Sequence, residues 1–84
     1  MITVLYFAWL KERMNRADEQ LVLPPEVNTV AALAAFLRTR DINGARAFAD
    51  PDLVRAAVNQ DFALPDTPIV SGDEIAFFPP VTGG

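Results

Sequence analysis

The chain has 84 residues, of which 51% are hydrophobic, and a formal net charge of −4. This length predicts one small domain, which must bury its apolar residues efficiently to be stable. The lack of cysteine excludes disulfides, catalytic thiols and thiolate metal sites, and the lack of histidine removes the usual general base and the commonest zinc ligand. We therefore expect no metal site.

Charge and hydropathy also narrow the classes of partner. An acidic domain is a poor match for nucleic acid. Most acidic residues lie in 41–84, where they would suit a basic protein surface or would only keep the domain in solution. The longest apolar run, residues 30–37, is far shorter than the span of about 20 residues that a membrane helix needs, and the N-terminal stretch does not have the charge order of a signal peptide. We expect a cytoplasmic protein that binds neither nucleic acid nor membrane.

Two strands are expected in the first 25 residues. Residues 2–9, ITVLYFAW, are rich in β-branched and aromatic side chains, and both faces of such a strand would be apolar, which predicts a central strand. The polar residues 11–20 predict a turn or loop, and residues 21–25, LVLPP, predict a second strand that ends at its prolines. The two faces of the first strand would carry Ile2, Val4 and Tyr6 on one side and Leu5, Phe7 and Trp9 on the other.

A helical period begins near residue 30. Four apolar residues fall at i, i+3, i+4 and i+7, namely Val30, Leu33, Ala34 and Leu37. This spacing predicts a helix that runs to about Arg40, with Asn28 or Thr29 as its N-cap. The pair Asn43-Gly44 predicts the end of this element. Residues 45–52 allow a short helical turn that ends at Asp50-Pro51.

Two further strands follow the helix. Residues 53–60, LVRAAVNQ, predict a third strand, and residues 73–78, DEIAFF, predict a last one, while the prolines and the Ser-Gly pair of residues 62–72 indicate turns. The order strand, strand, helix, strand, strand predicts an α+β domain in which one main helix packs across a small mixed sheet. This arrangement is the β-grasp, or ubiquitin-like, fold.

The chain finishes with FFPPVTGG, which predicts a domain over residues 1–80 and a flexible tail over residues 81–84. Proline cannot donate to a sheet ladder, so Pro79-Pro80 should end the last strand. From Pro79 the tail could extend about 20 Å at roughly 3.3–3.6 Å per residue, and Gly83-Gly84 could pass a channel too narrow for other residues. The α-carboxylate of Gly84 would be the chemical group at the tip. The alternative is an inert, frayed end.

These residues resemble a known family. The terminal FFPPVTGG, preceded by SGDEIA and further upstream by AAVNQ, is similar to the end of molybdopterin synthase small subunits, the sulfur carriers of molybdenum cofactor synthesis. The stretch VLYFAWLKE resembles the opening strand and turn of that family. The likeness covers most of the chain and is weakest over residues 14–28 and 38–52.

The resemblance implies a specific role for the C-terminal residues. An E1-like activating enzyme would use ATP to form an acyl-adenylate at Gly84, and sulfur from an indirect donor would displace AMP to leave a thiocarboxylate. The tail would carry this group into the large subunit, where it gives sulfur to cyclic pyranopterin monophosphate (precursor Z) to build the molybdopterin dithiolene. The residues that would insert are Pro80, Val81, Thr82 and Gly83.

The resemblance also implies which residues contact the partner and which subunit is catalytic. By position, Phe7, Phe62, Phe78 and Pro79 would contact the large subunit. Alternation puts Phe77 and Phe78 on opposite faces of the last strand, and we expect Ile75 and Phe77 in the core and Phe78 outside. The chain shows no nucleophile with a base beside it, so it would be a non-catalytic sulfur donor with no permanently bound cofactor, within what the family implies is a heterotetramer.

Other interpretations remain open from the sequence. The carboxylate pairs Asp50 with Asp52 and Asp73 with Glu74 could serve acid/base or metal chemistry, but their proline and glycine neighbours favour turns. The same adenylated Gly-Gly end would serve a ubiquitin-like modifier joined to lysines or a sulfur carrier of the thiamine pathway. A plain interaction domain with an inert tail is the alternative from another class.

Overall fold

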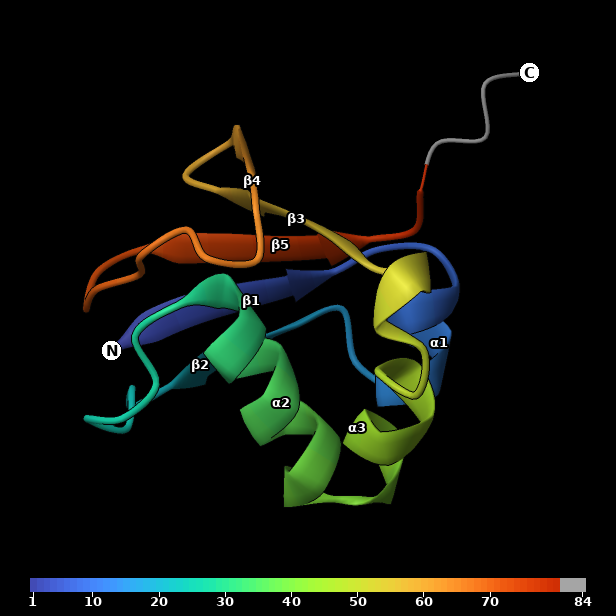
Figure 1. Ribbon diagram of the computed structural model, residues 1–84. Coiled ribbons are helices and arrows are strands. Elements are labelled where there is room, and N and C mark those ends of the chain that lie inside the picture. The colour runs from blue at the N-terminus through green and yellow to red at the C-terminus, as the bar shows by residue number, and fades with distance from the viewer. Residues whose placement is uncertain (81–84) are drawn as a thin grey trace.

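Residues 1–80, which the computed structural model describes, form one five-stranded mixed sheet whose helices lie on one side (Figure 1). The order across the sheet is β2-β1-β5-β3-β4, with β1 and β5 parallel and the other neighbouring pairs antiparallel. β5 is therefore the central strand. The strands are β1 (Ile2–Tyr6), β2 (Asp18–Leu21), β3 (Arg55–Val58), β4 (Asp61–Ala63) and β5 (Glu74–Phe78).

The main helix, α2 (Val30–Arg40), lies below the sheet in Figure 1. The Thr29 side chain accepts a hydrogen bond from the Ala32 N–H at 3.1 Å, which caps the helix as predicted. Its buried residues are Val30, Leu33 and Leu37, while Ala34 is half-buried at the side of the same stripe. A mixed sheet crossed by this helix is the β-grasp fold that the sequence predicts.

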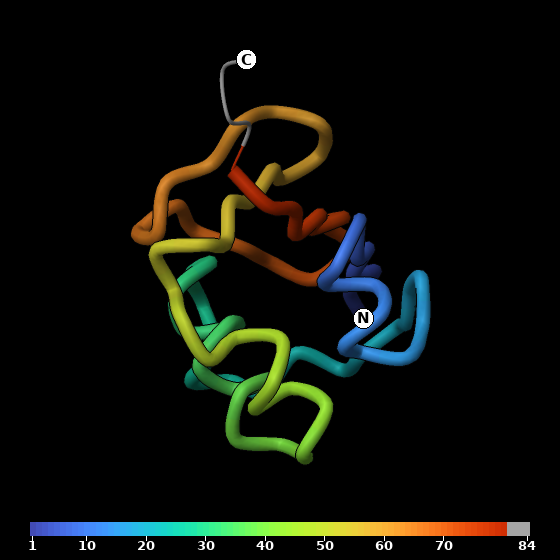
Figure 2. Tube along the Cα trace, turned by 90° about the vertical axis from the view of Figure 1, so that its right-hand side faces the viewer, coloured from blue at the N-terminus to red at the C-terminus, as the bar shows by residue number. Residues whose placement is uncertain are grey.

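The core fills the space between the sheet and the helices. The N-terminal strand and the C-terminal strand lie side by side above it (Figure 2). Ile75 and Phe77 of β5 are both fully buried, as alternation predicts. The Phe77 ring stacks on Tyr6 with centroids 6.4 Å apart and meets the edge of Phe48 at 5.0 Å. Aromatic packing therefore joins β1, β5 and the segment after α3 (Ile42–Ala47).

The structure differs from the prediction over residues 9–25. The segment expected to be a loop forms α1 (Trp9–Met14), which buries Leu10 and Met14 at i and i+4. Two buried residues in a polar stretch give only a weak periodic signal. Trp9, which was expected in the first strand, is the first residue of this helix. The second strand begins at Asp18 and ends at Leu21, because an edge strand can keep polar side chains in solvent.

In the middle of the chain, one further prediction is wrong and another is confirmed with shorter bounds. Asn43-Gly44 does not end an element, because α2 stops at Arg40 and Asp41 caps α3 by accepting the Gly44 N–H at 2.8 Å. Of the strand expected over 53–60, only residues 55–58 form a strand, β3. Residue 53 ends a 3-10 turn, η1 (Pro51–Leu53), and residues 59 and 60 form the turn before β4.

β4 was not expected from the sequence. Asn59 and Gln60 both have positive φ, 50° and 72°, and form the tight turn between β3 and β4. Such turns are usually recognised by an Asn-Gly or Asp-Gly pair, and Gln60 does not give that signal.

Candidate functional site

The helix-free side of the sheet is the first candidate surface. We call it the open face. Register places Leu5 of β1, Ala76 of β5, Ala57 of β3 and Phe62 of β4 in one row across four strands. The next row of the open face lies toward the N-terminal end of β5. It contains Thr3 and Glu74 and is polar. The open face is therefore apolar in its middle, and the row at the C-terminal end of β5 pairs Phe78 with Arg55.

Three of the four predicted interface residues, Phe7, Phe62 and Phe78, reach this face. Phe7 and Phe62 are 49% and 66% exposed, and Phe78 is half-buried on the side of β5 opposite Phe77. Exposed aromatics on one side of a sheet are typical of protein interfaces. The structure thus brings the three side chains to one face, while their contact with a partner stays a prediction.

The root of the tail continues from the central strand. Pro79 and Pro80 follow β5 and are half-buried. Because neither has an N–H to donate, the ladder ends here and the chain turns away from the sheet (Figure 1). The predicted tail residues Val81, Thr82, Gly83 and Gly84, and with them the domain boundary after residue 80, lie outside the described residues.

Phe7 is positioned by a tight turn between β1 and α1. Its N–H donates to the Phe77 carbonyl at 3.1 Å, and its own carbonyl accepts the Leu10 N–H at 3.2 Å. Ala8 between them has φ 56° and ψ −134°, a conformation that glycine adopts far more readily than alanine. With Tyr6 and Leu10 buried on either side, this turn holds Phe7 beside the root of the tail.

An ion-pair network supports the site from the helix side, and sequence reasoning missed it. Glu19 of β2 accepts two hydrogen bonds from Arg40 at 2.8 and 2.9 Å and one from the Tyr6 hydroxyl at 2.6 Å. Arg16 donates to the same carboxylate at 2.9 Å. The network joins β1, β2 and the end of α2, three elements that are distant in the sequence.

The network sets the ionisation of its members. Burial alone would raise the pKa of Glu19, but the hydrogen bonds from Arg40 and Tyr6 outweigh it, so this pKa lies below its usual value. Burial, followed by the hydrogen bond to Glu19, raises the pKa of Tyr6. The hydrogen bond to Glu19 raises the pKa of Arg40. Glu19 is therefore charged, and Tyr6 neutral, at neutral pH.

Replacing the carboxylate should reveal its contribution to stability. Glu19→Gln should lower the free energy of unfolding by about 2 kcal/mol at pH 7, because Arg40 loses a charged bidentate partner. The pKa of Glu19 is lower in the folded than in the unfolded chain, so its stabilisation is present above the reference value of 4.5 and disappears as the pH falls through the folded-state value. Urea unfolding at several pH values would measure both effects.

The control for this prediction is Glu12→Gln, which removes the same charge from an exposed position. The wild type should lose more stability than Glu19→Gln between about pH 5 and about pH 3, and Glu12→Gln should follow the wild type. Equal acid sensitivity of wild type and Glu19→Gln would contradict the role of the carboxylate.

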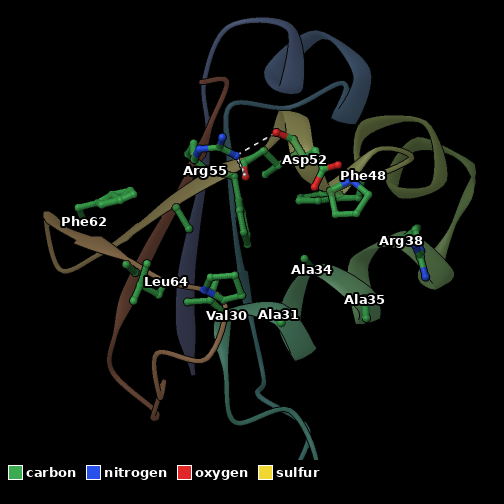
Figure 3. Close-up of a pocket in the computed structure, with 16 residues that line it drawn as sticks. Val30, Ala31, Ala34, Ala35, Arg38, Phe48, Asp52, Arg55, Phe62 and Leu64 are labelled. Atoms are coloured by element: carbon green, nitrogen blue, oxygen red, sulfur yellow. Dashed lines mark hydrogen bonds between the residues drawn. The ribbon is translucent and has the colours of Figure 1, made fainter. Parts of the chain in front are cut away.

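A second surface is a groove of about 460 Å³ between α2 and the β3–β4 edge of the sheet (Figure 3). The groove exists because alanines line both sides, Ala31, Ala34 and Ala35 from α2 and Ala56 and Ala63 from the strands. Phe62 stands at one side of it, and Arg38, Asp52 and Arg55 supply its charges. No serine or lysine lines it, so it offers apolar contact without a nucleophile.

The carboxylate pairs have structural roles. The Asp50 side chain accepts the Asp52 N–H at 3.0 Å, and Asp73 accepts the Val70 N–H at 2.9 Å and the Asn59 side-chain amide at 3.0 Å. These bonds confirm turn chemistry for Asp50 and Asp73, one member of each pair. Within residues 1–80 no group of three metal-ligating side chains is assembled, and no helix is both long and apolar enough to cross a membrane.

The chain is similar in sequence to one protein family and to two molybdopterin synthase sulfur carrier subunits. Over residues 4–84 the chain matches the model of the ThiS family. It is 40% identical to the molybdopterin synthase sulfur carrier subunit of Escherichia coli strain K12 and 34% identical to that of Haemophilus influenzae, and each match covers all of both chains.

Solved structures agree at the level of the fold. A putative molybdopterin converting factor subunit 1 from Pyrococcus furiosus has 28% identity and a TM-score of 0.75, with 95% of this chain and 97% of that chain covered. SAMP1 from Haloferax volcanii has 23% identity and a TM-score of 0.73, with 99% and 98% covered, and supports the fold alone. With its full-length match and shared fold, the chain belongs to the ThiS family, in which it is similar to molybdopterin synthase sulfur carrier subunits.

Proposed function

We propose that the chain is the sulfur carrier subunit of a molybdopterin synthase. The observation that carries the proposal is its full-length similarity to two such subunits, with an apolar open face beside the root of a Gly-Gly tail. Without cysteine, the chain can hold sulfur covalently only at a carboxyl group, and that of Gly84 is the most accessible.

The chemistry proceeds in two steps at the Gly84 carboxyl carbon. A carboxylate is a poor electrophile, so an E1-like activating enzyme first joins it to the α-phosphate of ATP and releases pyrophosphate. A sulfur nucleophile at the sulfide oxidation level, HS⁻, then attacks the carbonyl carbon, AMP leaves with its electron pair, and loss of a proton leaves a terminal thiocarboxylate. Transfer of this sulfur to cyclic pyranopterin monophosphate in the large subunit breaks the carbon–sulfur bond, and water supplies the oxygen that regenerates the carboxylate.

The division of roles follows from the residues of the chain. The open face offers apolar contact, and the described residues bring together no nucleophile with a general base. Substrate binding and proton transfer therefore fall to the large subunit, and adenylation falls to the activating enzyme. We place this exchange in the cytoplasm.

An intact-mass measurement tests the proposal directly. The protein, with an untagged C-terminus, is incubated with ATP, an activating enzyme of this family and a sulfur donor. We expect a mass gain equal to one oxygen exchanged for one sulfur, located on Gly84 by fragmentation. No gain with an enzyme that modifies a known carrier would reject it, and lysine-linked adducts of Gly84 would favour a ubiquitin-like modifier.

The open face gives a second test. Phe78→Asp should weaken binding to the large subunit by about 30-fold or more, since buried aromatics near the centre of an interface contribute most to affinity. Folding should change less, because Arg55 lies directly across from position 78 and offsets the new charge. Calorimetric titration would give the affinity, and thermal melting the stability.

Gln20→Asp is the matched control. It adds one negative charge to the same face, on edge strand β2 and in register with Thr3. Binding within about threefold of the wild type is expected for this variant. Two results together would contradict this interface. Phe78→Asp would unfold most of the protein, and the molecules that stay folded would bind the large subunit with wild-type affinity.

A further inference from the structure

One basic side chain, Arg55, stands at the open face next to the root of the tail, and it also borders the groove beside α2. Arg55 begins β3 and is paired in register with Phe78, the last residue of β5. Alternation turns Ala56 and Phe77 toward the core, so Arg55 and Phe78 point the other way. The remaining open-face residues among those described are apolar, polar or acidic, and include Thr3, Leu5, Asp18, Gln20, Ala57, Phe62, Glu74 and Ala76.

The guanidinium of Arg55 is held in place by the backbone. Its Nη1 atom donates to the main-chain oxygens of Asp52 at 2.9 Å and of Val54 at 3.3 Å (Figure 3). The last turn of η1 and the first residue before β3 therefore fix one nitrogen of the planar group. An arginine fixed in this way loses little conformational freedom when it binds a further group.

The same two contacts leave one edge of the guanidinium available. An arginine has five N–H donors, and the two on Nη1 are occupied by carbonyls. Within residues 1–80, no hydrogen bond or ion pair engages Nε or Nη2. These two nitrogens form the side of the fork that binds both oxygens of a carboxylate in parallel.

The surroundings favour a carboxylate that comes from a protein. Arg55 adjoins the apolar rows of the open face, so a partner that covers Phe78 would also remove water from the guanidinium. Burying an unpaired charge in that way is costly, and a paired carboxylate avoids the cost. The exposed basic residues of α1 and α2 lie on the helix side, so they cannot substitute for it.

We propose that Arg55 binds a carboxylate side chain of the large subunit in a bidentate pair, next to the entrance that receives the tail. This inference rests on the proposed function and specifies its interface. The pair would fix the rotation of the carrier on its partner, because a single cation on the face admits one position for the carboxylate. Arg55 is then a positioning residue and takes no part in the chemistry.

The test compares three variants for binding to the large subunit by surface plasmon resonance. Arg55→Gln should weaken affinity tenfold or more, mainly through faster dissociation. Arg55→Lys keeps the charge but not the fork, so it should recover only part of the loss. Arg38→Gln, which removes an exposed arginine of α2 from the groove, is the matched control and should stay within twofold. Thermal melting verifies that each variant is folded at the temperature of the measurement.

A charge reversal identifies the acceptor. Arg55→Glu is combined in turn with large-subunit variants in which one acidic surface residue is changed to Arg. Restored affinity for one combination and not for the others supports the pair. The inference is overturned if none restores binding, if Arg55→Gln slows only association and the effect vanishes at high salt, or if Arg55→Lys equals the wild type. Failure of the wild type to bind any large subunit would overturn the proposed function as well.

Discussion

A chain extended by one alanine after Gly84 should transfer no sulfur to the pterin substrate, while its domain remains folded. The extension moves the activated carbon by about 3.3–3.6 Å and adds a Cβ atom where the proposed channel admits only glycine. A displacement of this size removes the reacting atoms from attack distance, so we expect a loss of at least about 10²-fold. The measurement is molybdopterin formation with a large subunit and a chemically thiocarboxylated carrier.

Two comparisons separate this effect from loss of structure. The extended chain should keep the wild-type melting temperature and bind the large subunit through the open face within about threefold. Deletion of Gly84, which displaces the carboxyl carbon the other way, should be equally inactive. An extended chain that transfers sulfur at the normal rate would exclude the terminal thiocarboxylate mechanism.

Gly44→Ala should strongly destabilise the packing of α3 against α2. Gly44 is buried in α3, and a Cβ atom there would lie 1.7 Å from the Leu37 carbonyl oxygen of α2. Backbone atoms cannot move aside as a flexible side chain can, so α3 must shift away from α2. We expect the free energy of unfolding to fall by about 3 kcal/mol and the melting temperature by about 12–24 °C.

The same substitution at Gly72 provides the contrast. Gly72 has φ 96° and open space around the position of a Cβ atom, so Gly72→Ala adds backbone strain without a collision. Its cost should be about 1 kcal/mol, and Gly72→Asn should recover part of it because asparagine tolerates positive φ. Chemical denaturation of the three variants would measure the difference. Equal losses at Gly44 and Gly72 would show that α3 adapts freely.

Elements with a strong apolar pattern were predictable. The helical stripe from Val30 to Leu37 and the apolar strands β1 and β5 follow from local periodicity, because each buries its own side chains. α1 and β2 were missed because their formation depends on neighbours. Leu10 and Met14 signal a helix only once a core is there to bury them, and Asp18–Leu21 pairs with β1 through its backbone.

In the candidate site, too, the features set by local periodicity were predictable and those that depend on neighbouring elements were not. Alternation showed that Phe77 and Phe78 lie on opposite faces, and the structure confirms the expectation that Phe77 is in the core and Phe78 on the open face. The Glu19 network and the position of Arg55 could not be derived, since they depend on strand register and on contacts between elements far apart in the sequence. Backbone hydrogen bonds to a guanidinium leave no mark in the sequence.

The parallel pairing of β1 with β5 bears on how the protein is made. Thr3 pairs with Glu74, so the first strand to leave the ribosome has no central neighbour until nearly the whole chain has been synthesised. Contacts of such long sequence separation form late and make folding slow. A prematurely terminated chain that lacks β5 has neither a complete sheet nor a Gly-Gly end. Synthesis therefore couples the completion of the sheet to the presence of the two C-terminal glycines.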